Sequence, residues 1–230
     1  MVERRPPTAG GGRVRRVLLA CVVAASLGPR PSLAAEDLAS LARQVEAHPD
    51  VTYRAAFTWP CRWVTWERML AEPVLMGRLW RALGYEPAYD FSARGDTLHV
   101  VDPTGLVGDA LPVMTAPGAC TWWVDGRLNH WAVPVLNSGQ AVFVVRSRQV
   151  DGGVAVDLVV TVRAGSPLGN AVLRLARPLL AGHVQRRIDR NLRDGRRIAE
   201  LVETAPDSAL RLLDGGDAER FRRAFGPWRP

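Results

Sequence analysis

The stretch VAVDLVVTVR at residues 154–163 decides the fold. After it come Ser166-Pro167 and then a long segment whose apolar residues recur with a different period. In the stretch, every second side chain is apolar, which is the pattern of a β-strand with one buried face. From residue 168 to residue 202 the apolar residues instead recur every three or four positions, which predicts one long helix. Ser166 suits its N-cap and Pro167 its first position, and Pro178 predicts a kink.

Upstream of this point, short apolar runs alternate with turn residues. Phe143 and Val145 share one side of the preceding run, opposite Arg146 and Arg148. We expect an antiparallel meander of about six or seven strands. A first strand is expected at residues 50–57, before short helices at 61–70 and 73–83. The strands of the meander are expected at 88–91, 97–101, 110–114, 120–124, 127–136, 141–148 and 154–163, with Asp125-Gly126 as one of the turns.

The N-terminal residues have the pattern of an export signal. Five arginines precede Val17–Leu27, an uncharged apolar run of 11 residues, and Ser32-Leu33-Ala34 resembles a cleavage site. A membrane-spanning helix needs about 20 residues, which favours cleavage near Ala34 over a retained anchor. Arg15-Arg16 resembles a twin-arginine signal only in part, so the general secretory route is favoured. We therefore predict an exported protein, periplasmic or secreted.

The charge of the chain depends on this leader. The 230 residues carry a formal charge of +7, which by itself would suggest nucleic acid or anionic lipid as a partner. Residues 1–34 hold six Arg and one Glu, whereas the remainder holds 24 Arg and 22 acidic residues. Because most of the excess lies in the leader, we expect no nucleic-acid partner.

The predicted organisation is a leader at 1–34, a helix and linker at 35–50, one domain at 51–205 and a tail at 206–230 with a short helix at 217–225. Cys61 and Cys120 remain after cleavage. An even pair in an oxidising compartment predicts a disulfide, and two buried thiols are the alternative. No spacing of Cys and His suggests a metal site, and we expect no cofactor.

The order of elements is strand, two short helices, curved meander and long C-terminal helix. In this order residues 51–205 resemble the START and polyketide-cyclase-like superfamily (SRPBCC), whose α+β fold is called the helix-grip. The resemblance implies that the sheet wraps around the long helix and leaves an elongated apolar cavity. Such cavities hold lipids, sterols, polyketides or other hydrophobic molecules.

Residues of the expected cavity wall are chosen from the apolar faces of these elements. Trp122 and Trp123 are adjacent on a strand and point to opposite faces; we place Trp122 inside and Trp123 in solvent or at a membrane-facing rim. The expected ligand-binding residues are Trp66, Trp80, Trp122, Trp131, Phe143, Val145, Leu158, Leu175 and Leu179. Conceivable polar groups of the cavity are His99, Asn129 and His130.

The sequence predicts binding of a hydrophobic molecule rather than catalysis, because it contains none of the common catalytic motifs. Two alternatives stay open: an enzyme of the cyclase or aromatase type, and an envelope protein that binds another protein without a ligand. The basic half of the long helix is either a solvated face or a surface that contacts anionic membranes. Its arginines are Arg186, Arg187, Arg190, Arg193 and Arg197.

Overall fold

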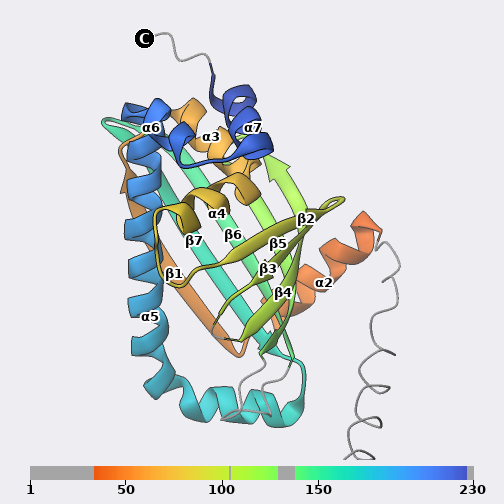
Figure 1. Ribbon diagram of the computed structural model, residues 1–230. Coiled ribbons are helices and arrows are strands. Elements are labelled where there is room, and N and C mark those ends of the chain that lie inside the picture. The colour runs from red at the N-terminus through yellow and green to blue at the C-terminus, as the bar shows by residue number, and fades with distance from the viewer. Residues whose placement is uncertain (1–33, 104, 129–137, 227–230) are drawn as a thin grey trace, which may run out of the picture. The chain divides into compact units, whose positions relative to one another are not determined.

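A computed structural model describes residues 34–103, 105–128 and 138–226, and within the long helix the side chains of 173, 174, 176–181 and 183 are outside that description. Residues 35–230 form one compact unit. In chain order the elements are α2 (Ala35–Ala47), β1 (Val51–Trp59), α3 (Trp63–Ala71), α4 (Pro73–Ala82), β2 (Asp90–Arg94), β3 (Thr97–Val101), β4 (Leu106–Ala116), β5 (Ala119–Leu128), β6 (Gly139–Val150), β7 (Gly153–Ala164), α5 (Pro167–Thr204), α6 (Pro206–Arg211) and α7 (Gly215–Phe225) (Figure 1).

The strands form a single antiparallel sheet in the order β1-β7-β6-β5-β4-β3-β2. The predicted meander is therefore confirmed, together with its order of elements. One turn was placed wrongly: Asp125 and Gly126 lie inside β5, opposite Gln140 and Gly139 of β6. An Asp-Gly pair favours a tight turn only when the neighbouring strand does not satisfy its backbone groups, and here β6 pairs with both residues.

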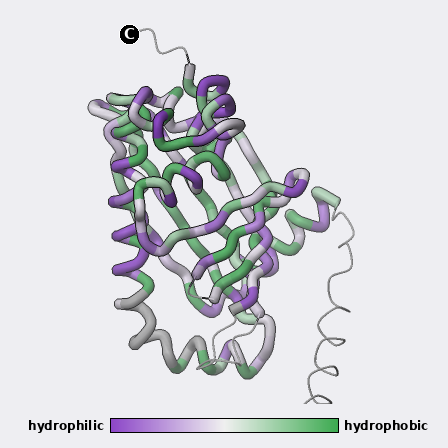
Figure 2. Tube along the Cα trace, in the orientation of Figure 1, coloured by the Kyte–Doolittle hydropathy of each residue, from purple (hydrophilic) through white to green (hydrophobic). Residues whose placement is uncertain are grey.

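The long helix α5 begins where its capping residues predict. The Ser166 Oγ accepts a hydrogen bond of 3.0 Å from the backbone N–H of Gly169, and Pro167 takes the first position. Figure 1 shows α5 changing direction within its N-terminal half, where the sequence contains a proline. In Figure 2 hydrophobic residues follow the strands, whereas hydrophilic residues mark the side of α5 that faces away from the sheet.

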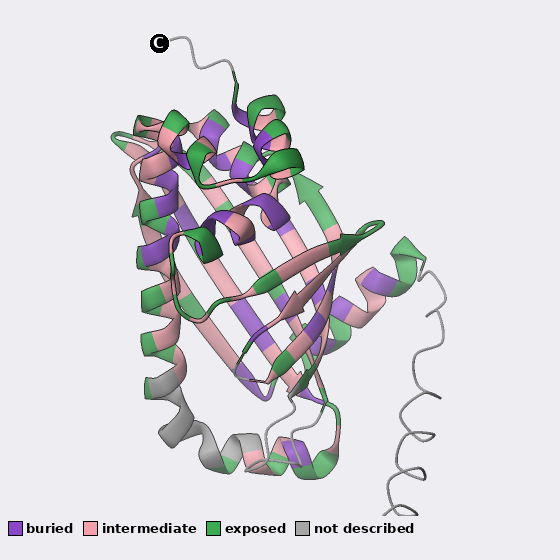
Figure 3. Cartoon of the chain, in the orientation of Figure 1, coloured by how far each residue is buried: buried purple, intermediate pink, exposed green. Residues whose placement is uncertain are grey.

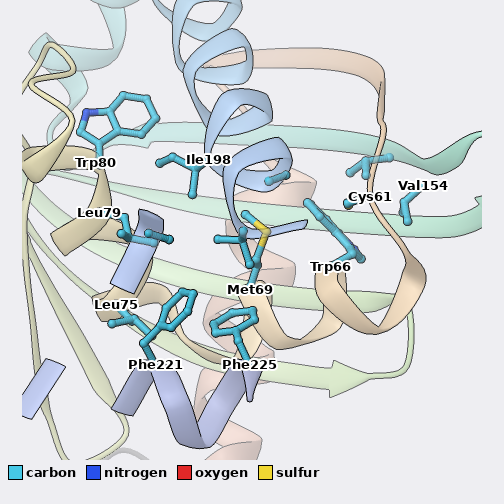
Figure 4. Close-up of a cluster of buried hydrophobic side chains, with 14 residues drawn as sticks. Cys61, Trp66, Met69, Leu75, Leu79, Trp80, Val154, Ile198, Phe221 and Phe225 are labelled. Atoms are coloured by element: carbon cyan, nitrogen blue, oxygen red, sulfur yellow. The ribbon is translucent and has the colours of Figure 1, made fainter. Parts of the chain in front are cut away.

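One face of the sheet, the inner face, packs against α3–α7. Its main core contains side chains from every one of these helices and from β7 (Figure 4). Phe221 and Phe225 of α7 are 3% and 1% exposed and stack on each other at 4.9 Å between ring centroids. The expectation that residues 206–230 form a marginal tail is thus wrong, because α6 and α7 contribute buried apolar side chains to the core. The sequence of this segment is short and rich in polar residues, so it gave no reason to expect this packing.

The opposite, outer face is covered in part by α2. Leu38, Ala42 and Val45 of this helix pack on Trp123 and Val142. Trp123 is only 5% exposed, so its expected position in solvent or at a membrane-facing rim is wrong. The apolar side of α2 removes the indole ring from water, and this partner comes from a segment that the sequence indicated only as a linker helix.

Sheet and helix approach each other closely at Gly195 of α5. A Cβ atom at this position would lie 2.9 Å from two atoms of the Trp59 indole ring, a distance that real Cβ atoms do not reach. Gly195 therefore lets a large aromatic side chain of β1 lie against the helix backbone. The ring also meets Trp66 of α3 edge-on, at 4.9 Å between centroids, so the indole cannot move aside freely.

We predict that Gly195→Ala destabilises the protein by about 1–3 kcal/mol, because the added methyl group overpacks this contact. The matched control is Gly182→Ala in the same helix, where, among the described side chains, an arginine terminus 3.5 Å away is the nearest atom to the new Cβ. That change should stabilise the protein by up to about 1 kcal/mol through helix propensity. Urea unfolding followed by circular dichroism measures the change in the free energy of unfolding for each variant. If both variants changed it in the same direction, the prediction would be contradicted.

Candidate functional site: an apolar inner wall

The inner face of the sheet carries two neighbouring rows of apolar residues. One row runs across four strands as Trp122, Phe143, Val160 and Tyr53, and the next as Cys120, Val145, Leu158 and Ala55. We call these eight residues the inner wall. Phe143 is 36% exposed although it lies on a central strand and on the inner face. Half-buried residues predominate along the strands of the sheet, as Figure 3 shows. Val160 and Cys120 of the inner wall are buried and Val145 packs against the main core, so the apolar surface that the core leaves open is centred on Phe143.

A cavity of about 530 Å³ opens on one side of the inner wall. Trp122 and Cys120 contribute to it, together with Leu98 of β3 and Pro112 of β4. Leu70 and Val74 belong to the helices that line it opposite the sheet. Arg220 of α7 also lines it and binds Glu72 at 2.5 Å. The volume falls in the range of small-molecule pockets.

Four of the residues chosen from sequence lie together in the inner wall: Trp122, Phe143, Val145 and Leu158. Two tryptophans chosen with them belong to the packed core instead. Trp66 and Trp80 are 4% and 8% exposed, and their indole N–H groups donate to Ser147 Oγ at 2.8 Å and to the Pro87 carbonyl at 2.9 Å. Protein side chains surround both rings and satisfy both indole N–H groups, so neither ring presents a surface to a ligand. Placing them in a ligand-binding wall was wrong.

Two further choices are also wrong. Leu175 is 82% exposed, because its part of α5 lies before the segment that packs on the core. His99 lies on the outer face, since its inward-facing neighbours on β2 and β3 are Phe91 and Val100, and its Nδ1 is 2.6 Å from Asp109 Oδ1. Four remaining choices fall outside the described residues or side chains: Trp131, Leu179, Asn129 and His130.

The predicted disulfide is not formed: Cys61 and Cys120 are both free and buried thiols. Cys61 belongs to the main core, whereas Cys120 faces the cavity at the inner wall. Burial and the nearby negative charge of Glu203 raise the pKa of Cys61 to about 11. Burial also raises the pKa of Cys120, against a hydrogen bond with Trp122 that lowers it. An even number of cysteines therefore did not indicate a bond.

A polar cluster on the inner side was not found from sequence. The Tyr89 hydroxyl oxygen accepts hydrogen bonds from Nε and Nη2 of Arg187, at 3.2 and 3.0 Å, and from Asn191 Nδ2 at 2.8 Å. Nη2 of Arg187 also donates to Asp102, whose side chain is 1% exposed. The available signal was Asn191, a polar residue on the side of α5 that carries Ile188 and Ile198.

This cluster removes Arg187 from the expected membrane-contacting arginines, because its guanidinium binds Asp102 and Tyr89 rather than solvent ions. Arg197 is exposed but pairs with Asp194 at 3.3 Å. Arg186, Arg190 and Arg193 are exposed on one side of α5 and have no ion-pair partner among the described residues.

The outer face has a larger hollow, of about 820 Å³, beside the end of α2. Charged groups of both signs line it, including Arg54, Arg146, Glu46 and Asp157. Within the described part of the chain, no group of three or more His, Cys, Asp or Glu residues could hold a metal ion. None of the described helices is long and apolar enough to cross a bilayer.

The fold and the inner wall define a class: an α+β protein in which a curved antiparallel sheet and a long C-terminal helix enclose apolar surface, the arrangement of a helix-grip protein. No protein-family model matches the chain. No curated protein matches it either.

Three solved structures are among those similar to this chain. A conserved protein from Geobacillus kaustophilus is 10% identical over 65% of this chain and 95% of its own, with a TM-score of 0.48. A putative uncharacterized protein from Rhizobium leguminosarum is 14% identical over 65% and 94%, with a TM-score of 0.44. Ara h 8.0201 is 12% identical over 65% and 97%, with a TM-score of 0.43. Because all three TM-scores are under 0.5, the class is taken from the sheet topology of this chain itself.

We predict that neither Cys61 nor Cys120 reacts quickly with a thiol reagent in the native protein. With a pKa of about 11, only about one Cys61 in a thousand is a thiolate at pH 8, and burial blocks access as well. In a Cys21→Ser chain under native, non-reducing conditions we expect no rapid labelling by Ellman's reagent, and two thiols per chain after denaturation. Fewer than two thiols in the denatured sample would contradict the free state of both cysteines.

Proposed function

We propose that this protein is an exported binding or carrier protein that holds a hydrophobic molecule, such as a lipid, sterol or polyketide, against the inner wall. The observation that carries the proposal is the exposure of Phe143, 36% on the inner face of a central strand. An apolar side chain in the middle of a sheet normally packs against another layer, and burial of such surface by a ligand is favourable by about 25 cal/mol per Å².

The surroundings of Phe143 support this proposal. Trp122, Val160 and Tyr53 continue its row across the sheet, and the cavity beside Trp122 has an apolar lining from α3 and α4. Binding is favoured over a cyclase-type reaction because His99, one of the polar groups expected inside the cavity, lies on the outer face. Export rests on the leader sequence at residues 1–34 alone.

The direct test is organic extraction or native mass spectrometry of the purified protein. A co-purifying hydrophobic molecule of constant stoichiometry supports the proposal. A chain that carries none, and that also fails to bind added apolar probes, contradicts it and favours an envelope protein that binds another protein.

We predict that Phe143→Ser weakens binding of the apolar fluorophore N-phenyl-1-naphthylamine roughly tenfold, because about 1–2 kcal/mol of apolar contact is lost. The effect on folding stability should be small, since the side chain is already exposed in part. Fluorescence titration measures the affinity, and circular dichroism checks the fold.

The control is Leu212→Ser, which removes another exposed apolar side chain, 39% exposed and far from the inner wall in sequence. It should leave probe affinity unchanged. An equal loss in the two variants would mean that the probe binds general apolar surface.

We further propose that Arg186, Arg190 and Arg193 hold the protein against anionic lipid during exchange of its ligand. These positions are spaced by four and three residues, so their side chains follow one side of α5. Each arginine near an anionic surface contributes about 1 kcal/mol. In support of this proposal, all three are exposed, and none has an ion-pair partner among the described residues.

We predict that changing these three residues to Gln lowers co-sedimentation with phosphatidylglycerol vesicles by roughly 10- to 100-fold in affinity. Binding of the wild-type chain should also fall at high salt. The control changes Arg94, Arg222 and Arg223, three exposed arginines elsewhere, to Gln. Equal recovery of wild type on phosphatidylcholine vesicles would contradict the proposal.

A further inference from the structure

The first two turns of α5 present a row of apolar side chains to solvent. Leu168 and Leu175 are 61% and 82% exposed, the two largest values among the large hydrophobic side chains of the described residues. Ala171 lies between them in sequence and is exposed as well. Positions three and four residues apart are neighbours on one side of a helix. We call these three residues the apolar stripe.

Hydrogen bonds hold the start of α5 in place beneath the apolar stripe. The Ser166 Oγ accepts from the backbone N–H of Gly169 at 3.0 Å, and Gly169 itself is buried. Just before the helix, the backbone N–H of Ala164 donates to the buried Asp50 carboxylate at 3.0 Å. The exposure of the two leucines therefore belongs to a capped helix that contacts the protein with its other side. A group of exposed apolar side chains of this kind marks a surface that contacts a protein or a membrane.

The charges along this part of α5 have one sign. Between residues 165 and 188 the sequence contains four arginines and neither Asp nor Glu, whereas residues 189–204 contain four acidic residues. Leucines on one side of a basic helical segment without acidic residues are the pattern of a helix that lies in the interface of an anionic membrane. The charge pattern therefore favours lipid over a basic protein as the partner of the apolar stripe.

The exposed arginines of α5 are close enough to reach the same bilayer. Leu175 and Arg186 are 11 residues apart in one helix, which is at most about 17 Å along its axis, and any bend shortens this distance. The apolar face of an interfacial helix is buried about 5–10 Å into the boundary between headgroups and acyl chains. Arginines that bind lipid phosphates therefore leave the leucines within reach of the acyl chains.

A second copy of the chain is a less suitable partner. Two copies that paired through the apolar stripe would bring two basic segments without acidic residues against each other, and like charges across an interface are unfavourable. An anionic bilayer instead offers both an apolar interior for the leucines and negative charge for the arginines.

We propose that the apolar stripe inserts into an anionic bilayer, while Arg186, Arg190 and Arg193 bind its lipid phosphates. This inference rests on the membrane contact of the proposed function and adds an apolar anchor to it. Salt screens the contact of the arginines, but it does not screen the burial of leucine side chains. Part of the binding should therefore persist at high salt.

The first test is co-sedimentation with phosphatidylglycerol vesicles of the chain that begins at Ala35, the compact unit without the leader. Changing Leu168 and Leu175 together to Ser should weaken binding about tenfold or more, and the binding that remains for the unchanged chain at about 1 M salt should be lost. Circular dichroism checks the fold of the variant.

The matched control changes Val64 and Leu212 together to Ser. These side chains are 41% and 39% exposed. They belong to α3 and to the end of α6, which Figure 1 shows at the opposite end of the molecule from the start of α5. This variant should bind the vesicles as the unchanged chain does.

The second test places an environment-sensitive NBD label in the apolar stripe by Leu175→Cys. Cys61 and Cys120 are buried thiols, so a brief reaction labels residue 175 alone. The NBD emission should rise and shift to the blue on phosphatidylglycerol vesicles, because the label enters an apolar medium. A label at Leu212→Cys should keep its aqueous spectrum.

The outcomes separate the proposals. If the chain binds phosphatidylglycerol vesicles but the label at residue 175 keeps its aqueous spectrum, or if the Ser variant binds equally well, insertion is refuted and the contact of the arginines stands. If the unchanged chain sediments as a dimer and the Ser variant as a monomer, the apolar stripe is an interface between copies and the proposal is overturned. If the chain binds no vesicles, the membrane contact itself fails, while the fluorophore titration still decides the carrier function.

Discussion

The contact between the Trp59 ring and the backbone of α5 at Gly195 determines how sheet and helix meet. A side chain at position 195 would push the helix away from β1, and the core would lose the fit between Ile198 and the strands beneath it. Glycine costs about 1 kcal/mol in a helix interior, and burying most of a tryptophan ring offsets that cost. This close approach fixes the C-terminal half of α5 against the sheet, whereas Leu175 in the N-terminal half is 82% exposed.

Polar interactions then hold α5 at two levels. Near its C-terminus, Glu203 accepts hydrogen bonds from Arg62 Nε at 2.6 Å and from the fully buried Thr65 hydroxyl at 2.5 Å, which ties the start of α3 to the helix. Further toward the N-terminus, Arg187 binds Tyr89 and Asp102. Between core and cluster these polar contacts hold the helix in place, whereas Phe143 on the inner wall stays 36% exposed. The difference between these regions is the physical basis for expecting a ligand there.

Much of the fold could be predicted because alternation and helical periodicity are local properties. The strand with Val154 and Val156, the strand with Phe143 and Val145, and the helix starting at Ser166-Pro167 each contained their own signal. The candidate site was harder. Trp122 and Phe143 were placed correctly from alternation, but Trp66 and Trp80 could not be distinguished from them, since an aromatic residue on the apolar side of a helix fits a core and a ligand wall equally well. The prediction of a disulfide was wrong for a related reason. An even number of cysteines says nothing about how far apart they lie in the fold.

By itself the sequence determined most of the residues that form strands and helices, which side of β6 and β7 is apolar, where α5 begins, and that the excess positive charge lies in residues 1–34. Only the tertiary structure decided which apolar faces find a partner. It placed α2 over Trp123, brought α7 into the core, turned His99 outward and joined Tyr89 to Arg187 and Asn191 across about a hundred residues of chain. Secondary structure follows from interactions between near neighbours in sequence, whereas a binding site depends on contacts between distant segments, which no local pattern records.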